Sequence, residues 1–133
     1  MFTQTRKPAY LVKWYISGGS YTPAITVRIH DKAVSGLKLS SDSDKLIVST
    51  SDGFVKLVSP SNLKVQFEKR LHKMVVTCAM IDSSEGILVT GSNDYAYNIL
   101  SASTFNPKAI VGRIFFQVFL MVLTLFYISE YLV

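Results

Sequence analysis

A repeat of about 42 residues is the feature of this sequence that most limits its possible folds. The matched positions at that offset are His30 with His72, Val34 with Val76, residues 46–50 with 88–92, and Asp52 with Asp94. A period near 42 with short strands in each copy is typical of a β-propeller blade. The repeat therefore predicts an all-β fold, a partial WD-repeat β-propeller with about two and a half blades of four antiparallel strands.

Apolar runs between turn residues predict the strands within each copy. In the first copy they are residues 34–39, 46–51, 54–59 and 63–68, and in the second 75–81, 87–92 and 95–100. Residues 11–16 and 24–29 are predicted to be the last two strands of a preceding blade. The second copy is predicted to lack its fourth strand, because the chain turns toward a membrane at residues 101–108.

A nearly unbroken apolar stretch, residues 110–129, follows the repeats. Twenty helical residues span about 30 Å, the thickness of the hydrocarbon core, so the stretch predicts one C-terminal transmembrane helix. Asn106 and Pro107 suit an N-cap and a first helical position. A buried core helix is the alternative, but apolar side chains cover every face. Only Arg113 and Gln117 are strongly polar within the stretch.

Charges beside the stretch predict its orientation. Lys108 and Arg113 lie at its start and only Glu130 follows it, so the positive-inside rule places the N-terminal side in the cytosol. The expected organisation is the end of a preceding blade at 1–29, a WD-like blade at 30–71, a last, incomplete WD-like blade at 72–106, and a transmembrane anchor at 107–130.

Three polar positions recur in both copies at equal spacing. They are His30, Thr50 and Asp52 in the first and His72, Ser92 and Asp94 in the second. A WD blade commonly buries such a set with a tryptophan on its third strand. The tryptophan position holds Val58 and Leu100 here, and Trp14 is a candidate for that position in its own blade. A catalytic triad is the alternative, but the duplication favours a structural hydrogen-bonded set.

Composition narrows the possible functions further. The net charge of +5 comes from scattered basic residues without a basic stripe, so we predict no nucleic-acid site, and an anionic membrane surface is a better partner. Cys78 is the only cysteine, which suits a reducing compartment. Its apolar neighbours in the sequence favour a core residue over a nucleophile.

No group of residues in the sequence points to catalysis. Asp42 and Asp44 are a pair of carboxylates, but they fall in a predicted turn, where a solvated position is the better interpretation than an acid–base site. We predict no catalytic residue, cofactor or metal site, and therefore no enzyme.

Several segments, in order, carry a family resemblance. They are residues 8–14, residues 30–40, residues 51–55, the phrase His-Lys-Met-Val-Val-Thr at 72–77, and the apolar C-terminal stretch. In that order, from Arg6 to Leu100 and on to the anchor, the chain resembles the C-terminal part of the prolactin regulatory element-binding protein family. Those proteins are WD-repeat guanine-nucleotide exchange factors of the endoplasmic reticulum that activate the Sar-type small GTPase of COPII coats.

The resemblance implies a cytosolic propeller that is anchored in the endoplasmic-reticulum membrane by a single pass and binds a Sar-type GTPase. In that family the exchange-active loop projects from the amino-terminal blade, which no residue of this sequence matches, so no catalytic residue is carried over. Two other hypotheses remain for comparison. One is a membrane-anchored WD-repeat scaffold for protein–protein interaction. The other is a hydrolase built on the histidine set, which the duplication disfavours.

Overall fold

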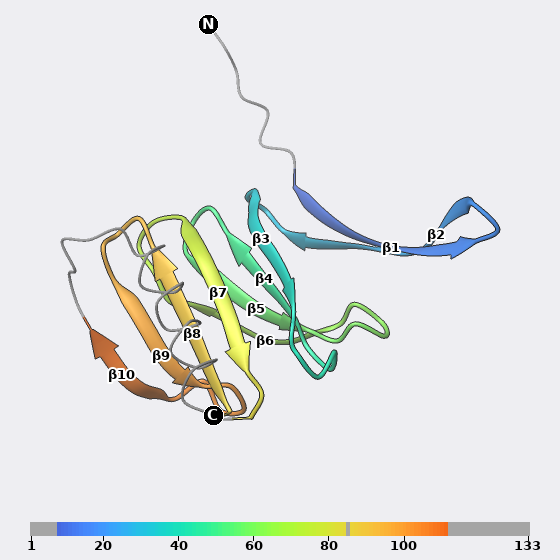
Figure 1. Cartoon of the computed structure of the whole chain (residues 1–133). Coiled ribbons are helices and arrows are strands. Elements are labelled where there is room, and N and C mark those ends of the chain that lie inside the picture. The colour runs from blue at the N-terminus through green and yellow to red at the C-terminus, as the bar shows by residue number, and fades with distance from the viewer. Residues whose placement is uncertain (1–7, 85, 112–133) are drawn as a thin grey trace, which may run out of the picture.

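The computed structural model describes residues 8–84 and 86–111, which form ten strands in three antiparallel sheets (Figure 1). The strands are β1 (Ala9–Ser17), β2 (Ser20–His30), β3 (Val34–Leu39), β4 (Leu46–Thr50), β5 (Phe54–Val58), β6 (Val65–Arg70), β7 (Val76–Asp82), β8 (Ile87–Ser92), β9 (Tyr97–Ser101) and β10 (Pro107–Val111). All nine predicted strands are present, with small differences at their ends.

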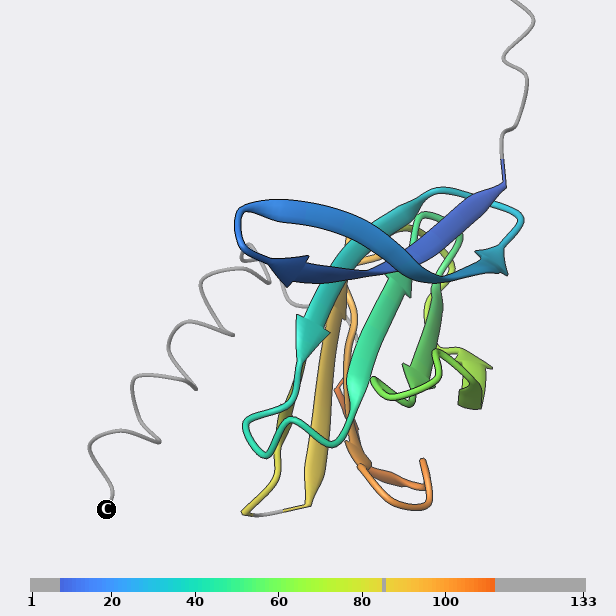
Figure 2. The same ribbon diagram turned by 90° about the vertical axis from the view of Figure 1, so that its right-hand side faces the viewer.

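The three sheets follow the predicted blades. The first blade is a four-stranded sheet in the order β3-β4-β5-β6, and the second has the order β10-β9-β8-β7. Sequential antiparallel neighbours of this kind make each sheet a meander, as in a propeller blade. Ahead of them, β1 and β2 form a separate two-stranded hairpin. It runs across the strands of the first blade at a large angle (Figure 2).

The prediction that the second blade lacks its fourth strand is wrong, because β10 completes it. Ala109, Ile110 and Val111 pair with β9, and the open edge of β9 is thereby satisfied. Asn106 and Pro107 therefore enter a strand rather than cap a helix. β-Branched residues such as Ile110 and Val111 suit a strand as well as an apolar helix, and a sequence that continues into an apolar run does not separate the two.

The turn before β10 repeats the turn before β6. Leu63 and Phe105, 42 residues apart, are both buried and both have positive φ, at 56° and 57°. Their amides donate to the carbonyls of Ser59 and Ser101 respectively, each at 2.9 Å. A buried side chain holds each turn in this conformation, and the Phe105 ring stacks on Phe67 with 3.6 Å between centroids.

The predicted transmembrane anchor lies almost entirely beyond residue 111 and so outside the described residues, as do Arg113, Gln117 and Glu130. Among residues 8–84 and 86–111 there is no helix of the length and apolarity that a membrane crossing needs.

Apolar contacts between sheets make up the core. One cluster joins the two blades through Ile47, Val55 and Leu57 on one side and Ile81 and Leu88 on the other. A second cluster joins the hairpin to the opposite face of the first blade; its buried members are Leu11, Ile29, Val48, Val58 and Leu63. The first blade is therefore covered on both faces, as stacked sheets require.

Polar contacts reinforce the same interfaces. Ser35 donates to the carbonyl of Val76 at 2.6 Å, and the hydroxyls of Ser41 and Ser83, at equivalent positions of the two blades, lie 3.1 Å apart. Gly53 occupies the turn between β4 and β5 with φ of +94°, and its carbonyl accepts from the amides of Leu71 and His72. A Cβ at this position would lie 1.9 Å from the His72 carbonyl oxygen, so only glycine permits this approach.

Candidate functional site: two histidine networks and an inter-blade groove

The first histidine network joins the end of β2 to the β4–β5 turn. His30 Nε2 lies 2.9 and 3.1 Å from the two carboxylate oxygens of Asp52. Thr50 donates to the same carboxylate at 2.6 Å and accepts from the amide of Phe54 at 3.0 Å. Burial by itself would raise the pKa of Asp52, but the hydrogen bonds from Thr50 and His30 outweigh it and lower the pKa. This network confirms the predicted grouping of His30, Thr50 and Asp52.

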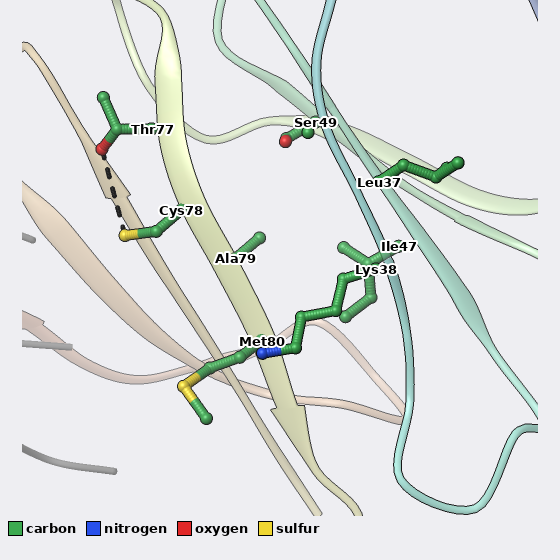
Figure 3. A pocket seen from close by; sticks show the side chains of 9 residues that line it. Leu37, Lys38, Ile47, Ser49, Thr77, Cys78, Ala79 and Met80 are labelled. Carbon is green, nitrogen blue, oxygen red and sulfur yellow. Dashed lines mark hydrogen bonds between the residues drawn. The ribbon is translucent and has the colours of Figure 1, made fainter. Parts of the chain in front are cut away.

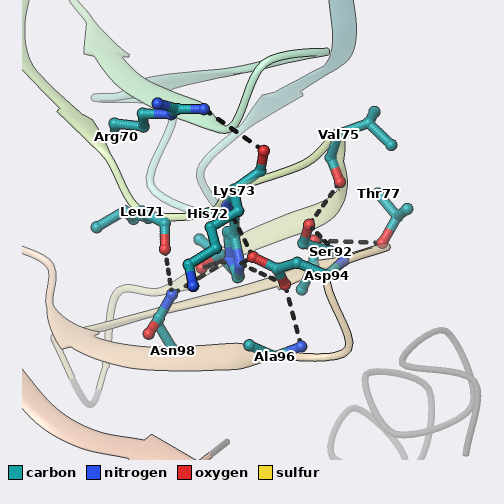
Figure 4. Close-up of polar contacts among 12 residues, drawn as sticks. Arg70, Leu71, His72, Lys73, Val75, Thr77, Ser92, Asp94, Ala96 and Asn98 are labelled. Carbon is teal, nitrogen blue, oxygen red and sulfur yellow. Dashed lines mark hydrogen bonds and ion pairs between the residues drawn. The ribbon is translucent and has the colours of Figure 1, made fainter. Parts of the chain in front are cut away.

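The second network is more extensive and more deeply buried (Figure 4). His72 Nδ1 lies 3.2 Å from both oxygens of Asp94, and its Nε2 lies 2.9 Å from the hydroxyl of Thr90. The side-chain amide of Asn98 donates to the Leu71 carbonyl at 3.1 Å and lies 3.3 Å from His72 Nε2. The His72 side chain is fully buried, so every polar atom on the ring needs a protein partner.

These partners fit one tautomer of neutral His72. Nδ1–H donates to the Asp94 carboxylate, and Nε2 accepts from the Thr90 hydroxyl. Burial disfavours the charged imidazolium and lowers the pKa of His72, although Asp94 acts in the opposite direction. The network therefore stabilises His72 in its neutral form.

Asp94 also organises the backbone around it. Its carboxylate accepts from the amide of Lys73 at 2.8 Å and from the amide of Ala96 at 3.0 Å. Burial alone would raise the pKa of Asp94, but these two amides together with His72 outweigh it, and the pKa is lowered. Asp94 thus ties the chain before β7 to the turn between β8 and β9.

The structure changes one member of the predicted second set. Ser92 does not contact His72; its hydroxyl donates to the Val75 carbonyl at 2.8 Å and accepts from the Asp94 amide at 3.2 Å. Thr90, two residues earlier on the same strand, is the hydroxyl that binds the ring. Residues two apart on a strand share a face, so spacing alone did not distinguish Thr90 from Ser92.

Polar residues on the third strands were also missed from the sequence. Lys56 on β5 and Asn98 on β9 are 42 residues apart, and each donates to the carbonyl immediately before the histidine of its blade. Lys56, almost fully buried, reaches Ile29 at 2.6 Å and forms an ion pair with Glu68 at 2.7 Å. The sequence did contain a signal for this pair: β5 and β9 are otherwise mostly apolar, and each carries a polar residue at the same position of the repeat.

The tryptophan positions behave differently from one another. Val58 and Leu100 are buried, as the pattern requires, without the indole that a WD blade commonly places there. Trp14, the candidate for that position in the hairpin, is 52% exposed and pairs with Pro23 on β2. Pro23 is the counterpart, at the 42-residue offset, of Val65 and Pro107, which pair with Val58 and Leu100, so the strand register supports the assignment of Trp14 to the tryptophan position.

The geometry of Thr90, His72 and Asp94 is that of a hydroxyl–imidazole–carboxylate relay, the arrangement used for nucleophilic catalysis. Thr90 has no exposed surface, however, and the His72 side chain has none either. A substrate cannot reach a nucleophile that is enclosed on all sides. The relay therefore stabilises the blade, and the described residues contain no group of side chains suited to hold a metal ion.

A groove of about 220 Å³ lies between the edge strands β3 and β7 of the two blades (Figure 3). Gly36, Leu37 and Lys38 of β3 line one side, and residues 77–80 of β7 line the other. Cys78 is half-buried there, and burial raises the pKa of its thiol, so the thiol stays protonated at neutral pH. The groove offers surface for contact but no activated nucleophile.

Comparisons with known proteins address the fold. No family model matches the sequence, and no curated protein matches it. A WD40-type β-propeller in the crystal structure of the mitotic checkpoint complex superimposes with a TM-score of 0.61 and 22% sequence identity. The described residues have the fold of part of a WD-repeat β-propeller. The match covers 69% of this chain and 30% of that one, so the chain spans less than a third of the similar protein's length.

The His72 network generates a stability prediction. Replacing Asp94 with alanine removes the acceptor for His72 Nδ1–H and for two backbone amides, which leaves buried donors unpaired. We expect a loss of about 1–3 kcal/mol in the free energy of unfolding, measured by urea titration with circular dichroism in detergent micelles. Asp31→Ala is the matched control, since Asp31 pairs with Arg28 in solvent. Equal unfolding curves for the two variants would contradict the assignment.

The same network predicts a pH dependence. Because the pKa of His72 is lower in the folded chain than its ordinary value of 6.5, the unfolded chain binds the proton more readily. Stability should be full above about pH 6.5 and should decline as the pH falls below it toward the folded pKa. Unfolding titrations between pH 7.5 and 5.5 measure this, and His72→Asn should flatten the profile over that interval. Constant or rising wild-type stability on acidification would overturn the expected sign.

Proposed function

We propose that this chain is the membrane-anchored, C-terminal part of a WD-repeat guanine-nucleotide exchange factor that activates a Sar-type small GTPase for vesicle budding at the endoplasmic reticulum. The observation that carries the proposal is the passage from a completed blade directly into an apolar sequence. β10 ends at Val111, and residues 112–129 still provide eighteen mostly apolar residues. As a helix they would span about 27 Å, within the range of a transmembrane segment.

The order of motifs supports the specific assignment. The resemblance to the exchange-factor family runs through the strands of the hairpin and both blades, and it ends at the anchor. The WD-repeat fold is compatible with that family, and the phrase at residues 72–77 lies between β6 and the start of β7, around the His72 network. Within the described residues every buried side-chain nitrogen or oxygen has a hydrogen-bond partner.

A membrane-anchored scaffold without exchange activity is the second candidate. The enclosed relay at His72 and the protonated Cys78 favour a protein that works through its surface rather than through chemistry. The two candidates share the fold, the anchor and the orientation, and they differ in whether a GTPase loses its nucleotide on contact.

Orientation in the membrane is the first test. Lys108 and Arg113 precede the apolar stretch, so the propeller side should face the cytosol. In microsomes, added protease should digest an N-terminal tag completely and leave a C-terminal tag intact. The reverse pattern would exclude a cytosolic GTPase as the partner.

Nucleotide release is the second test. The resembled family carries its exchange loop on the amino-terminal blade, which none of these residues match. We therefore expect the 133-residue chain in liposomes to bind a Sar-type GTPase weakly or not at all and to leave GDP release unaccelerated. Release of a fluorescent GDP analogue measures this, with a full-length family member as positive control. Acceleration equal to that control would place the exchange site inside this chain.

A further inference from the structure

The two blades have two ends, and β10 stops at the end that carries the histidine networks. In each antiparallel meander the start of the first strand, the turn between the second and third strands, and the end of the fourth strand all lie together. His72 precedes β7 at this end, and β10 stops there at Val111, opposite Tyr97 of β9. Ser41 and Ser83 meet at the other end. We call the end with the histidines the exit end, since the apolar residues 112–129 continue the sequence from it.

Basic side chains gather at the exit end, on the connection between β6 and β7. Lys69 and Arg70 end β6 and Lys73 follows them, and all three are exposed. Arg70 Nε donates to the Asp52 carbonyl at 3.1 Å, and its Nη2 donates to the Lys73 carbonyl at 3.4 Å (Figure 4). These bonds fix the connection beside the β4–β5 turn. Among the described residues neither Lys69 nor Lys73 forms an ion pair, so both ammonium groups can bind an anion.

The carboxylates at the exit end do not cancel this charge at the surface. Asp31 is already paired with Arg28, at 2.6 Å. Asp52 and Asp94 accept hydrogen bonds within the histidine networks, and their side chains are only 30% and 11% exposed. Lys32, between β2 and β3, adds a further positive charge. The solvent-facing surface of the exit end is therefore positive.

Two exposed side chains with the chemistry of a membrane interface lie beside the basic groups. Met74, 51% exposed, follows Lys73 directly, and Tyr95, 65% exposed, lies in the β8–β9 turn. The Asn93 amide donates to the Val75 carbonyl at 3.2 Å, which joins these two loops. Tyr95 has φ of 62°, a conformation that suits glycine or asparagine better, so the turn itself does not explain a tyrosine there. Tyrosine is one of the residues enriched where a membrane meets water.

We propose that a docking patch made of Lys69, Arg70, Lys73, Met74 and Tyr95 binds the surface of a bilayer that contains anionic lipid. The three cations bind headgroup phosphates, and Met74 and Tyr95 enter the boundary between headgroups and acyl chains. This inference rests on the membrane anchor of the proposed function. It adds which end of the blades lies against the membrane and which residues touch lipid.

The course of the chain favours lipid over a protein as the occupant of the docking patch. The apolar sequence begins directly after β10, with no polar linker, so an anchor there holds the exit end close to the bilayer. An acidic protein would have to enter the narrow space between this end and the membrane. Anionic headgroups are already present in that space, and each basic side chain close to them adds to binding.

A fluorescent label tests whether the exit end touches the membrane. Asn93→Cys places an environment-sensitive dye on the β8–β9 turn without removing a residue of the docking patch, in a chain whose only native cysteine is replaced, Cys78→Ser. With the full chain in phosphatidylcholine vesicles, inclusion of phosphatidylserine should shift the dye emission to the blue and allow quenching by a lipid-borne nitroxide. In about 1 M salt, where the screening length is about 3 Å, the shift should largely disappear. A label at Ser103→Cys, exposed at the other end of the same blade, should respond to neither change.

Charge reversals test the docking patch itself. Lys69→Glu combined with Lys73→Glu should lower the ratio of docked to undocked chain at least about tenfold, because each basic side chain near an anionic surface contributes to binding. Lys45→Glu combined with Lys64→Glu makes the same change of charge at the other end of the first blade and should leave the ratio unaltered.

Three results would overturn the docking patch. They are dye emission that does not depend on phosphatidylserine, an equal loss from both pairs of reversals, and a shift that needs an added Sar-type GTPase and occurs equally in neutral vesicles, which would assign the patch to a protein. Alkaline carbonate separates these results from failure of the anchor. A chain that carbonate extracts has no anchor, so the proposed function and the docking patch fail together. A chain that stays in the vesicles with an unresponsive label overturns the docking patch alone.

Discussion

Packing of one sheet face on the next is the interaction on which the rest of this structure depends. A single four-stranded meander has two faces and too few residues to enclose a core, so its stability comes from its neighbours. The first blade is the only described sheet with a neighbour on both sides, and Ile47 and Val48, adjacent on β4, point into the two different interfaces. The histidine networks add to this arrangement, since each fixes the chain that leads from one sheet into the next.

Most of the fold could be predicted from the sequence, because the 42-residue period and the turn residues indicate the same strand boundaries. The strands recur with the repeat, and turns rich in glycine, aspartate, serine or asparagine separate them. The error at β10 arose where two signals overlapped, since an apolar sequence suits both a strand and a membrane helix. The turn that identifies the strand was present: Ser59–Lys64 and Ser101–Asn106 are equivalent, with the same serine at the first position and an apolar residue at the fifth.

The residues of the histidine networks could be predicted from the sequence only where the two repeats carry the same residue. His30, Asp52, His72 and Asp94 recur and were found. Thr90 has Val48 as its equivalent and Asn98 has Lys56, so neither is marked by identity between copies. The difference has a physical consequence: His30 contacts its aspartate through Nε2 and His72 through Nδ1, because only the second ring has a hydroxyl to satisfy its other nitrogen. Partners of this kind depend on how a ring turns, which spacing does not encode.

The contact between Ser41 and Ser83 has a consequence for how such a molecule can grow. The two serines are the same position of successive repeats, so the blades meet head to tail, each offering one surface forward and another backward. Duplication of the coding segment for one blade supplies both halves of a further junction at once. A junction of this type does not by itself fix the number of blades. That number depends on the rotation from each sheet to the next, which adds up around an axis until the series of blades closes into a ring.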